Sequence, residues 1–255
     1  MMLEGKVGLV TGGGDGIGRA TSIMFAREGA KVAVAGRTLS KVEDTVAEIV
    51  SFGGEAVAIG ADVSREDEVK RMVEATIEAF GRLDCACNNA AGGGGFRHLH
   101  EVDEKNWELT HRVTLKGVWL GLKYQIPAML ETGGGAIVNI ASLSGVKGEA
   151  LQAPYSSAKG GVLALTKTAA AEYAQQGVRI NAINPGGILT RALKGYLETV
   201  PGAEEHTVKT HAMRRFGQPE EVADAVVYLC SDRSSFITGH ALNVDGGTMV
   251  NPHIL

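Results

Sequence analysis

The sequence predicts an α/β fold, a single doubly wound Rossmann-type domain over residues 1–255 in which a seven-stranded parallel sheet is flanked by helices on both faces. Short apolar runs alternate with segments of helical composition along the whole chain. Most of these runs are continuous in hydrophobicity, as in strands buried on both faces. No Pro/Ser-rich linker divides the chain, so a single large core is expected.

The expected elements alternate in order along the chain. Strands are expected at 6–10, 31–35, 55–60, 83–87, 136–141, 178–183 and 240–244. Helices are expected at 17–28, 38–52, 65–80, 103–130, 155–176 and 219–231. Right-handed crossovers between such strands place ligands at the carboxyl ends of the sheet.

Two longer segments have an irregular composition. One is the glycine cluster from Gly92 to Gly95 and the other spans 187–217; both come after expected strands, so both are placed to form the mouth of a site. The second mixes charges with Leu193, Tyr196 and Leu197. We expect it to act as an amphipathic lid over a partly apolar substrate.

Composition excludes several classes of function. The formal net charge of −4 leaves no basic excess for nucleic acid, and the longest uncharged run, 132–146, is too short to span a bilayer. The three cysteines, Cys85, Cys87 and Cys230, are too few for a disulfide framework or a four-ligand zinc site. We therefore expect a cytoplasmic protein with neither a nucleic acid nor a membrane partner.

A glycine-rich turn comes directly after the first expected strand. In VTGGGDGIGRA (10–20), Gly12, Gly16 and Gly18 have the spacing G-x-x-x-G-x-G, with Asp15 and Ile17 between them. Glycines let the backbone approach a pyrophosphate, and the N-terminus of the next helix favours its charge. A tight turn alone needs fewer glycines, so the pattern indicates a dinucleotide site.

The end of the second expected strand bears on the choice between NAD and NADP. An NAD site has an Asp or Glu there to accept from the ribose 2′-OH, but this chain has Arg37 and no acid between Glu28 and Glu43. Arg37 would meet a 2′-phosphate, which favours NADP(H), with NAD(H) still possible. Asp15 would oppose that phosphate unless it is turned away.

A phenol and an ammonium lie one helical turn apart. Pro154 fits a helix start, and Tyr155 and Lys159 then share a face. An ammonium about 4 Å from the phenol would favour phenolate by roughly 4 kcal/mol, which predicts a lowered tyrosine pKa. Ser142, at the end of the fifth expected strand, could hold a substrate oxygen beside Tyr155. Alone, such a pair is usually a solvated helix face, and such a serine usually caps a turn.

Together these motifs resemble the short-chain dehydrogenase/reductase family over nearly the whole chain. The matching segments are the glycine turn, CNNAAG (87–92), the residues Ser142, Tyr155 and Lys159, INPGGILT (183–190), RFGQPEEVADAVVYLCSD (215–232) and ITGHALNVDGG (237–247). The resemblance implies a homo-oligomer, often a tetramer, that acts on a small alcohol or carbonyl substrate.

The resemblance also implies roles for individual residues. Tyr155 would be the general acid/base, Lys159 its activator and a ribose ligand, and Ser142 the anchor of the substrate oxygen. The implied cofactor-binding residues are Gly12, Asp15, Gly16, Ile17, Gly18, Arg37, Asp62, Val63, Asn89, Tyr155, Lys159, Pro185, Ile188 and Thr190. No metal is expected, because His98 and His100 have no obvious third ligand, although both could touch substrate.

One position departs from the family pattern. Within HRVTLKGVWLG (111–121), Thr114 stands where the family usually has an asparagine of the proton relay, and a hydroxyl cannot replace both functions of an amide. Two hypotheses result. The chain is an NAD(P)-dependent oxidoreductase that exchanges a hydride between nicotinamide and a secondary alcohol or ketone, or it is a cofactor-sensing or scaffold protein with weak catalysis because of Thr114.

Overall fold

The structure, a computed structural model in which residues 1–250 are described, contains one seven-stranded sheet. All strands are parallel, in the order β3-β2-β1-β4-β5-β6-β7. The strands are β1 (Val7–Thr11), β2 (Lys31–Gly36), β3 (Ala56–Gly60), β4 (Cys85–Asn88), β5 (Gly135–Ile140), β6 (Val178–Pro185) and β7 (Ala241–Val244). The predicted fold class and all seven predicted strands are confirmed, with shifts of one or two residues at most ends.

Helices connect the strands. They are α1 (Gly16–Arg27), α2 (Leu39–Ser51), α3 (Glu66–Phe80), α4 (Glu104–His111), α5 (Gly117–Leu130), α6 (Leu143–Lys147), α7 (Ala153–Tyr173), α8 (Arg191–Thr199), α9 (Ala203–Thr210) and α10 (Pro219–Cys230). A short π-helical turn, η2 (Arg112–Lys116), joins α4 to α5, so the helix expected at 103–130 has a different hydrogen-bond pattern at its middle.

The expectation of an irregular segment at 187–217 is wrong, because α8 and α9 form within it. Thr190 begins α8 by accepting a hydrogen bond from the Leu193 backbone, and the apolar residues of this helix have helical spacing. The expected amphipathic character of this segment is thus that of a helix, with charged residues between the apolar ones. The five-residue helix α6 was also not expected.

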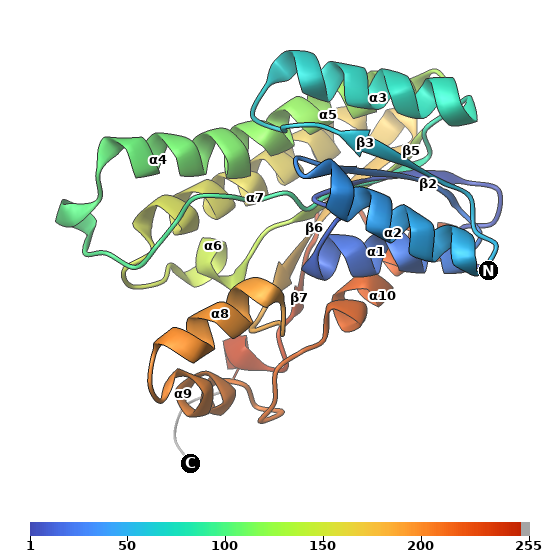
Figure 1. The fold of residues 1–255 in the computed structure, drawn as a ribbon. Coiled ribbons are helices and arrows are strands. Elements are labelled where there is room, and N and C mark those ends of the chain that lie inside the picture. Colours follow the sequence, from blue (N-terminus) through green and yellow to red (C-terminus); the bar gives the residue numbers. More distant parts are fainter. Residues whose placement is uncertain (251–255) are drawn as a thin grey trace.

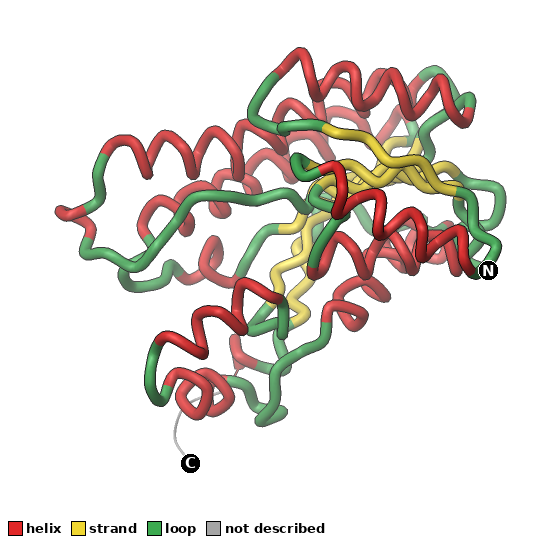
Figure 2. The backbone as a smooth tube through the Cα atoms, in the orientation of Figure 1, coloured by secondary structure: helices red, strands yellow, loops and turns green. Residues whose placement is uncertain are grey.

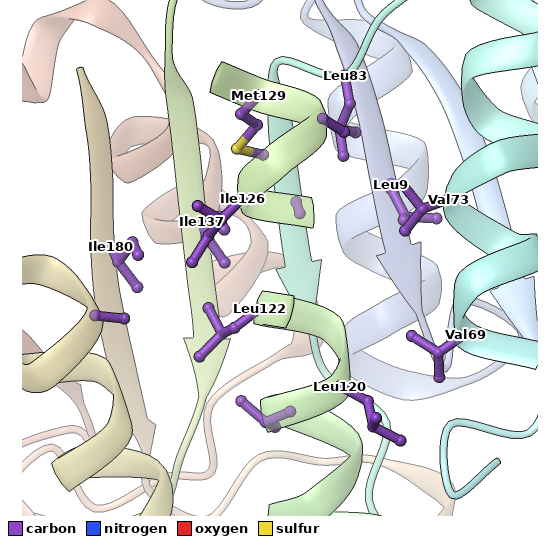
Figure 3. Packing of buried hydrophobic residues seen from close by; sticks show 14 of the residues in the cluster. Leu9, Val69, Val73, Leu83, Leu120, Leu122, Ile126, Met129, Ile137 and Ile180 are labelled. Carbon is purple, nitrogen blue, oxygen red and sulfur yellow. The ribbon is translucent and has the colours of Figure 1, made fainter. Parts of the chain in front are cut away.

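The helices form one layer on each face of the sheet (Figure 1). Helices α1, α2 and α10 pack on one face, and α3, α5 and α7 pack on the other. Figure 3 shows the core between the sheet and α3, α5 and α7, in which Leu9 of β1 lies beside Val73 of α3 and Ile137 of β5 beside Ile126 of α5. Strand β1 is buried along its whole length, which explains its continuous hydrophobicity.

The strand order places a crevice between β1 and β4. The chain proceeds from β1 to β2 and β3 on one side and from β4 to β7 on the other. Connections therefore diverge at this point and leave room above the carboxyl ends of the two strands, where open α/β sheets bind ligands. Through residue 250, none of the helices combines the length and apolarity needed to cross a bilayer.

Candidate active site

A cavity of about 1340 Å³ opens at the carboxyl edge of the sheet. It is lined by the segments that come after each of the strands β1 to β6, and by residues of α7, α8 and α9. The structure brings nearly all of the predicted site residues to it: Gly12, Asp15, Gly16, Ile17, Arg37, Asp62, Val63, Asn89, Ser142, Tyr155, Lys159, Pro185, Ile188 and Thr190. Gly18 and Thr114 are not among its lining residues.

The glycine turn presents bare backbone to this cavity. Gly12 and Gly16 have positive φ angles of 66° and 51°, which side chains rarely adopt. Gly18 serves packing instead, because a Cβ there would lie 2.2 Å from the Gly12 carbonyl oxygen and would push α1 off β1. The Asn89 amide holds the turn from the β4 side by donating to the backbone oxygens of Thr11 and Gly12, at 3.0 and 3.3 Å.

The start of α1 fits the phosphates of a dinucleotide. Asp15 occupies the N-cap position, yet its side chain makes no hydrogen bond to the first helical turn, so those N–H groups remain for an anion. The Asp15 carboxylate instead lies 3.2 Å from the Lys41 ammonium and 3.9 Å from the Arg191 guanidinium. These two cations offset the charge that would oppose a phosphate.

Basic side chains gather where β2 ends. Arg37 comes directly after the strand and is exposed, and it lines the cavity together with Thr38 and Lys41. The charge of Arg37 acts on Asp62, which comes after the neighbouring strand β3: burial raises the pKa of that carboxyl, but hydrogen bonds from Ser64 and the Arg37 charge bring it below its ordinary value. The arrangement suits an anionic group beside the ribose.

Helix α7 carries the predicted acid/base pair. Tyr155 faces the cavity and is half-buried, whereas Lys159, one turn later, is 1% exposed. The Lys159 ammonium donates to the carbonyl oxygen of Ile140, the last residue of β5, at 2.5 Å. It also lies 5.6 Å from the centre of the Tyr155 ring. The predicted sharing of one helix face is therefore confirmed.

The predicted direction of the tyrosine pKa is wrong. Burial raises the pKa of Tyr155, and a hydrogen bond with Ser142 offsets only part of that rise. Burial also lowers the pKa of Lys159 to about 8. The ammonium lies against the ring and is itself desolvated, so its attraction for a phenolate does not exceed the cost of removing the phenolate from water.

Ser142 lies just beyond β5, on the same side of the cavity as Tyr155. Its hydroxyl accepts from the Ser144 backbone N–H at 3.1 Å and begins α6. The same hydroxyl is close enough to the Tyr155 phenol to lower the pKa of that phenol. The turn-capping and substrate-anchoring interpretations of this serine are thus compatible, because an oxygen that accepts one backbone N–H retains a proton to donate.

Residues beyond β6 form the opposite wall. Pro185 ends the strand, buried Ile188 pairs with Gly217, and Thr190 begins α8. A buried imidazole, that of His211, joins this wall to α9: Nε2 accepts from the Gly187 N–H at 3.0 Å, and Nδ1 lies 2.8 Å from the Thr207 carbonyl oxygen. These contacts fix the neutral tautomer in which Nδ1 carries the proton.

Thr114 makes its hydrogen bonds to the loop after β4 and none to the acid/base pair. It is fully buried in η2, and its hydroxyl both donates to and accepts from the backbone of Gly92, at 3.1 and 3.2 Å. The contacts found for the Lys159 ammonium are to Ile140 and Tyr155. Thr114 therefore anchors the loop after β4. No direct contact with Lys159 or Tyr155 supports its predicted catalytic role.

A comparison with protein families decides which family this site represents. A family model described as enoyl-(acyl carrier protein) reductase matches residues 12–249. The chain belongs to the short-chain dehydrogenase/reductase family. Members of this family are oxidoreductases that use NAD or NADP, so the predicted family and the predicted class of enzyme are confirmed.

Several relatives of this short-chain dehydrogenase act on cyclic compounds by name. It is 41% identical over 94% of both chains to cyclohexanol dehydrogenase from Acinetobacter sp.. It is 42% identical to 2,5-dichloro-2,5-cyclohexadiene-1,4-diol dehydrogenase from Sphingobium indicum, over 96% of this chain and 97% of the relative. The solved structure of levodione reductase superposes with a TM-score of 0.93 at 34% identity, over 96% of this chain and 98% of that chain.

Some residues of this reductase site were missed by sequence reasoning. Phe96 and Leu151 line the cavity, and Lys41 pairs with Asp15. Phe96 had a detectable signal, since it ends the glycine cluster after β4. His98 and His100, in contrast, do not line the cavity. Within residues 1–250, no three His, Cys, Asp or Glu side chains gather in a way that could hold a metal ion.

Proposed function

We propose that this protein is an NADP(H)-preferring dehydrogenase/reductase that interconverts a cyclic secondary alcohol and its ketone. The observation that carries the proposal is that Tyr155, Ser142 and Lys159 line the same cavity as a glycine turn at a helix N-terminus. The nicotinamide cofactor supplies or accepts the hydride. The residues of this chain bind and orient the cofactor and the substrate, and they transfer the proton.

In the proposed reduction, the Tyr155 phenol donates its proton to the carbonyl oxygen of the substrate. A raised pKa keeps the phenol protonated at neutral pH, as an acid requires. Ser142 donates to the same oxygen and so fixes it beside the phenol. In the oxidation direction the phenolate removes the hydroxyl proton, and the Lys159 ammonium stabilises that phenolate while it remains charged, below about pH 8.

The remaining site residues are assigned to the cofactor. The pyrophosphate would be held by Gly12, Gly16 and Ile17, and the adenine by Asp62 and Val63. Asn89 would line the cofactor cleft. Pro185, Ile188 and Thr190 would hold the nicotinamide carboxamide, and Lys159 the ribose. Gly18 would act through packing and Asp15 through its ion pair with Lys41.

The preference for NADP(H) rests on the basic end of β2. Arg37 and Lys41 lie there, and the one nearby acid in the glycine turn, Asp15, is already paired. We expect NADPH to bind more tightly than NADH. Replacing Arg37 by Asp should weaken NADPH binding about 10-fold to 100-fold and narrow or reverse the preference. Tighter NADH binding to the unmodified chain would refute this assignment.

The proposed substrate class rests on the apolar residues of the cavity. Leu143, Leu151 and Val113 line the same cavity as Tyr155, together with Phe96 and Tyr196. Such a lining suits a compact hydrocarbon ring, and the names of the two relatives with cyclohexane-derived substrates support the same class. A panel of cyclic and acyclic secondary alcohols and ketones, assayed with both cofactors, tests it directly.

The decisive test of the enzyme assignment is Tyr155→Phe. This change removes one hydroxyl and keeps the ring that packs against Lys159. Turnover should fall by at least 10²-fold to 10⁴-fold, while NADPH binding stays within about two-fold. Undiminished turnover would reject Tyr155 as the acid/base. Ser142→Ala should lower kcat less, because it leaves the phenol in place.

A cofactor-sensing or scaffold protein is the second candidate, and the position of Thr114 favours it. No relay asparagine stands in η2, and the threonine hydroxyl is engaged with Gly92. Turnover of any alcohol or ketone at rates of about 1 s⁻¹ or more would reject the scaffold role. Thr114→Asn offers a further test, because a scaffold with a defective relay should then gain activity.

The assembly and location of the enzyme are also part of the proposal. We infer a cytoplasmic homotetramer that acts on a small molecule, with residues 1–255 forming one domain and 187–217 its substrate lid. Partly exposed Trp107 of α4 and Trp119 of α5 are suitable for subunit contact, at 38% and 42% exposure. Sedimentation equilibrium measures the assembly, and a monomer at micromolar concentration would refute it.

A further inference from the structure

Three polar side chains on one helical face bind the loop after β4. Asn106, Thr110 and Thr114 recur at every fourth residue through α4 and η2. The Gly94 N–H donates to the Thr110 hydroxyl at 2.8 Å, and the Asn106 amide donates to the Gly94 carbonyl oxygen at 2.7 Å. Thr114 bonds Gly92 in the same way. The loop is thus anchored at several points.

The loop backbone is shaped for these contacts. Gly93, Gly94 and Gly95 have φ angles of 74°, 94° and 119°, which favour glycine over all other residues. A Cβ on Gly93 would lie 2.3 Å from the Thr110 hydroxyl. The loop (Figure 2) therefore runs close against the helical face.

Phe96 contacts helix α8, which together with α9 forms the cover of the cavity. Its ring stacks on that of Tyr196 in α8, with centroids 4.9 Å apart and an angle of 27° between the ring planes. The next residue, Arg97, donates its backbone N–H to the Leu151 carbonyl oxygen at 2.9 Å, which fixes the loop to a third segment of the wall. Both rings line the same cavity as Tyr155.

Helix α8 is weakly packed, and this stack is one of its contacts with the rest of the cavity wall. None of its residues is fully buried, whereas α7 buries residues along its length. The ring pair is a contact between α8 and an anchored part of the wall, and stacked aromatic rings hold a preferred separation and offset. Removing one ring therefore changes both the shape of the substrate end and the attachment of its cover.

We propose that Phe96 and Tyr196 determine substrate selectivity by forming an aromatic clasp over the substrate end of the cavity. This inference rests on the proposed function and goes beyond it. The paired rings give an apolar boundary that a saturated or unsaturated six-membered ring can contact. A three-carbon alcohol can place its oxygen at Ser142 and Tyr155 and still leave the clasp untouched.

The test compares two alcohols on matched variants. Phe96→Ala and Tyr196→Ala should each lower kcat/KM for cyclohexanol by about ten-fold, which corresponds to about 1.4 kcal/mol. For propan-2-ol the loss should stay within about two-fold. The double variant should lose little more than either single variant, because the two rings act as a unit. Phe96→Tyr should retain the selectivity of the unmodified chain.

A control and a second measurement separate selectivity from general damage. Phe52→Ala makes the same chemical change at the end of α2, outside the cavity, and should leave both alcohols unaffected. Amide hydrogen exchange should rise several-fold in α8 of Phe96→Ala and stay unchanged in α10. NADPH binding should remain within two-fold for every variant.

The possible outcomes distinguish the clasp from the underlying activity. If the unmodified chain oxidises both alcohols and the variants keep the cyclohexanol to propan-2-ol ratio within two-fold, the clasp is refuted and the proposed function stands. Equal losses on both alcohols refute it as well. If the unmodified chain oxidises neither alcohol, the proposed substrate class fails and the clasp fails with it.

Discussion

The sheet-borne part of the site and its cover are built differently. On the sheet side, Lys159 is 1% exposed, donates to the end of β5 and lies in a 21-residue helix. The cover consists of α8 and α9, of nine and eight residues; α8 has no fully buried residue and α9 has Ala203 alone. In Figure 1 these two helices lie apart from the two helical layers.

This difference separates the reacting groups from the groups that select a substrate. Proton transfer requires fixed geometry, and long packed elements supply it. Entry and release of ligands require a segment that opens at low free energy, and a helix with few buried contacts can do so. The proposed acid/base groups therefore lie in the well-packed part, and Tyr196 of the proposed clasp lies in the weakly packed part.

The largest expected effect compares the same substitution in both parts. Leu120→Ala in α5 removes a side chain that is 0% exposed and should lower the free energy of unfolding by about 2–5 kcal/mol. Leu197→Ala in α8 removes a half-buried side chain and should cost less than about 1 kcal/mol. Denaturant unfolding measures both, and similar losses would show that the cover is as tightly packed as the core.

The next effect concerns the buried ammonium. Lys159→Met should abolish turnover and yet stabilise the fold at pH 7. The folded pKa is about 8, against an ordinary value of 10.5. That shift corresponds to about 3 kcal/mol of destabilisation while the group is charged in both states. Loss of the bond to Ile140 removes about 1 kcal/mol, so a net gain of about 2 kcal/mol is expected.

The stability gained by Lys159→Met depends on pH. Because the folded pKa of Lys159 is lowered, its folded state releases the proton first, and the unmodified chain gains stability as pH rises from about 8 to about 10.5. The advantage of Lys159→Met should therefore be full below pH 8 and shrink above it. Thermal unfolding at pH 7 and pH 9.5 checks this, and a constant difference would contradict it.

The fold could be predicted from the sequence because burial on both faces leaves a local mark. Strand β1 reads as a continuous apolar run, and the glycine turn at its end marks the passage into helix α1. The cover could not be predicted so well, because α8 is short and none of its residues is fully buried, although its charged residues Arg191, Lys194 and Glu198 share one helix face. Such a helix takes its position from long-range contacts that sequence periodicity does not report.

The site was predictable where motifs carry it. Tyr155, Lys159, Ser142 and the glycine turn all reach one cavity. The raised pKa of Tyr155 was not foreseen, because the balance between burial and a neighbouring charge depends on three-dimensional distances. The contacts of Thr114 were also hidden, although its helical spacing from Asn106 and Thr110 is a signal that could have indicated a shared partner.

A smaller effect is expected at the junction of the cover with the sheet side. His211→Leu removes the acceptor for the Gly187 N–H and the donor to the Thr207 carbonyl oxygen, and keeps a similar volume. An unsatisfied, partly buried N–H costs about 1–2 kcal/mol. Because these bonds attach α9 to the neighbouring wall and do not involve α7, amide hydrogen exchange should rise in α9 with little change in α7. A global loss of protection would show that the cover and the core unfold together.

The smallest expected effect is at the ion pair between the cover and the glycine turn. The Arg191 guanidinium lies 3.9 Å from the Asp15 carboxylate, the two side chains are 76% and 46% exposed, and Asp15 has Lys41 closer at 3.2 Å. Exposed pairs of this kind contribute at most about 1 kcal/mol and are screened by salt. Arg191→Gln should therefore change the Kd for NADPH by less than about three-fold at physiological salt. Lys194→Gln removes the same charge from the same helix and serves as the control. A loss above ten-fold for Arg191→Gln alone, measured by fluorescence titration, would mean that the cover contributes substantially to cofactor retention, and the division between a binding sheet and a selecting cover would then fail.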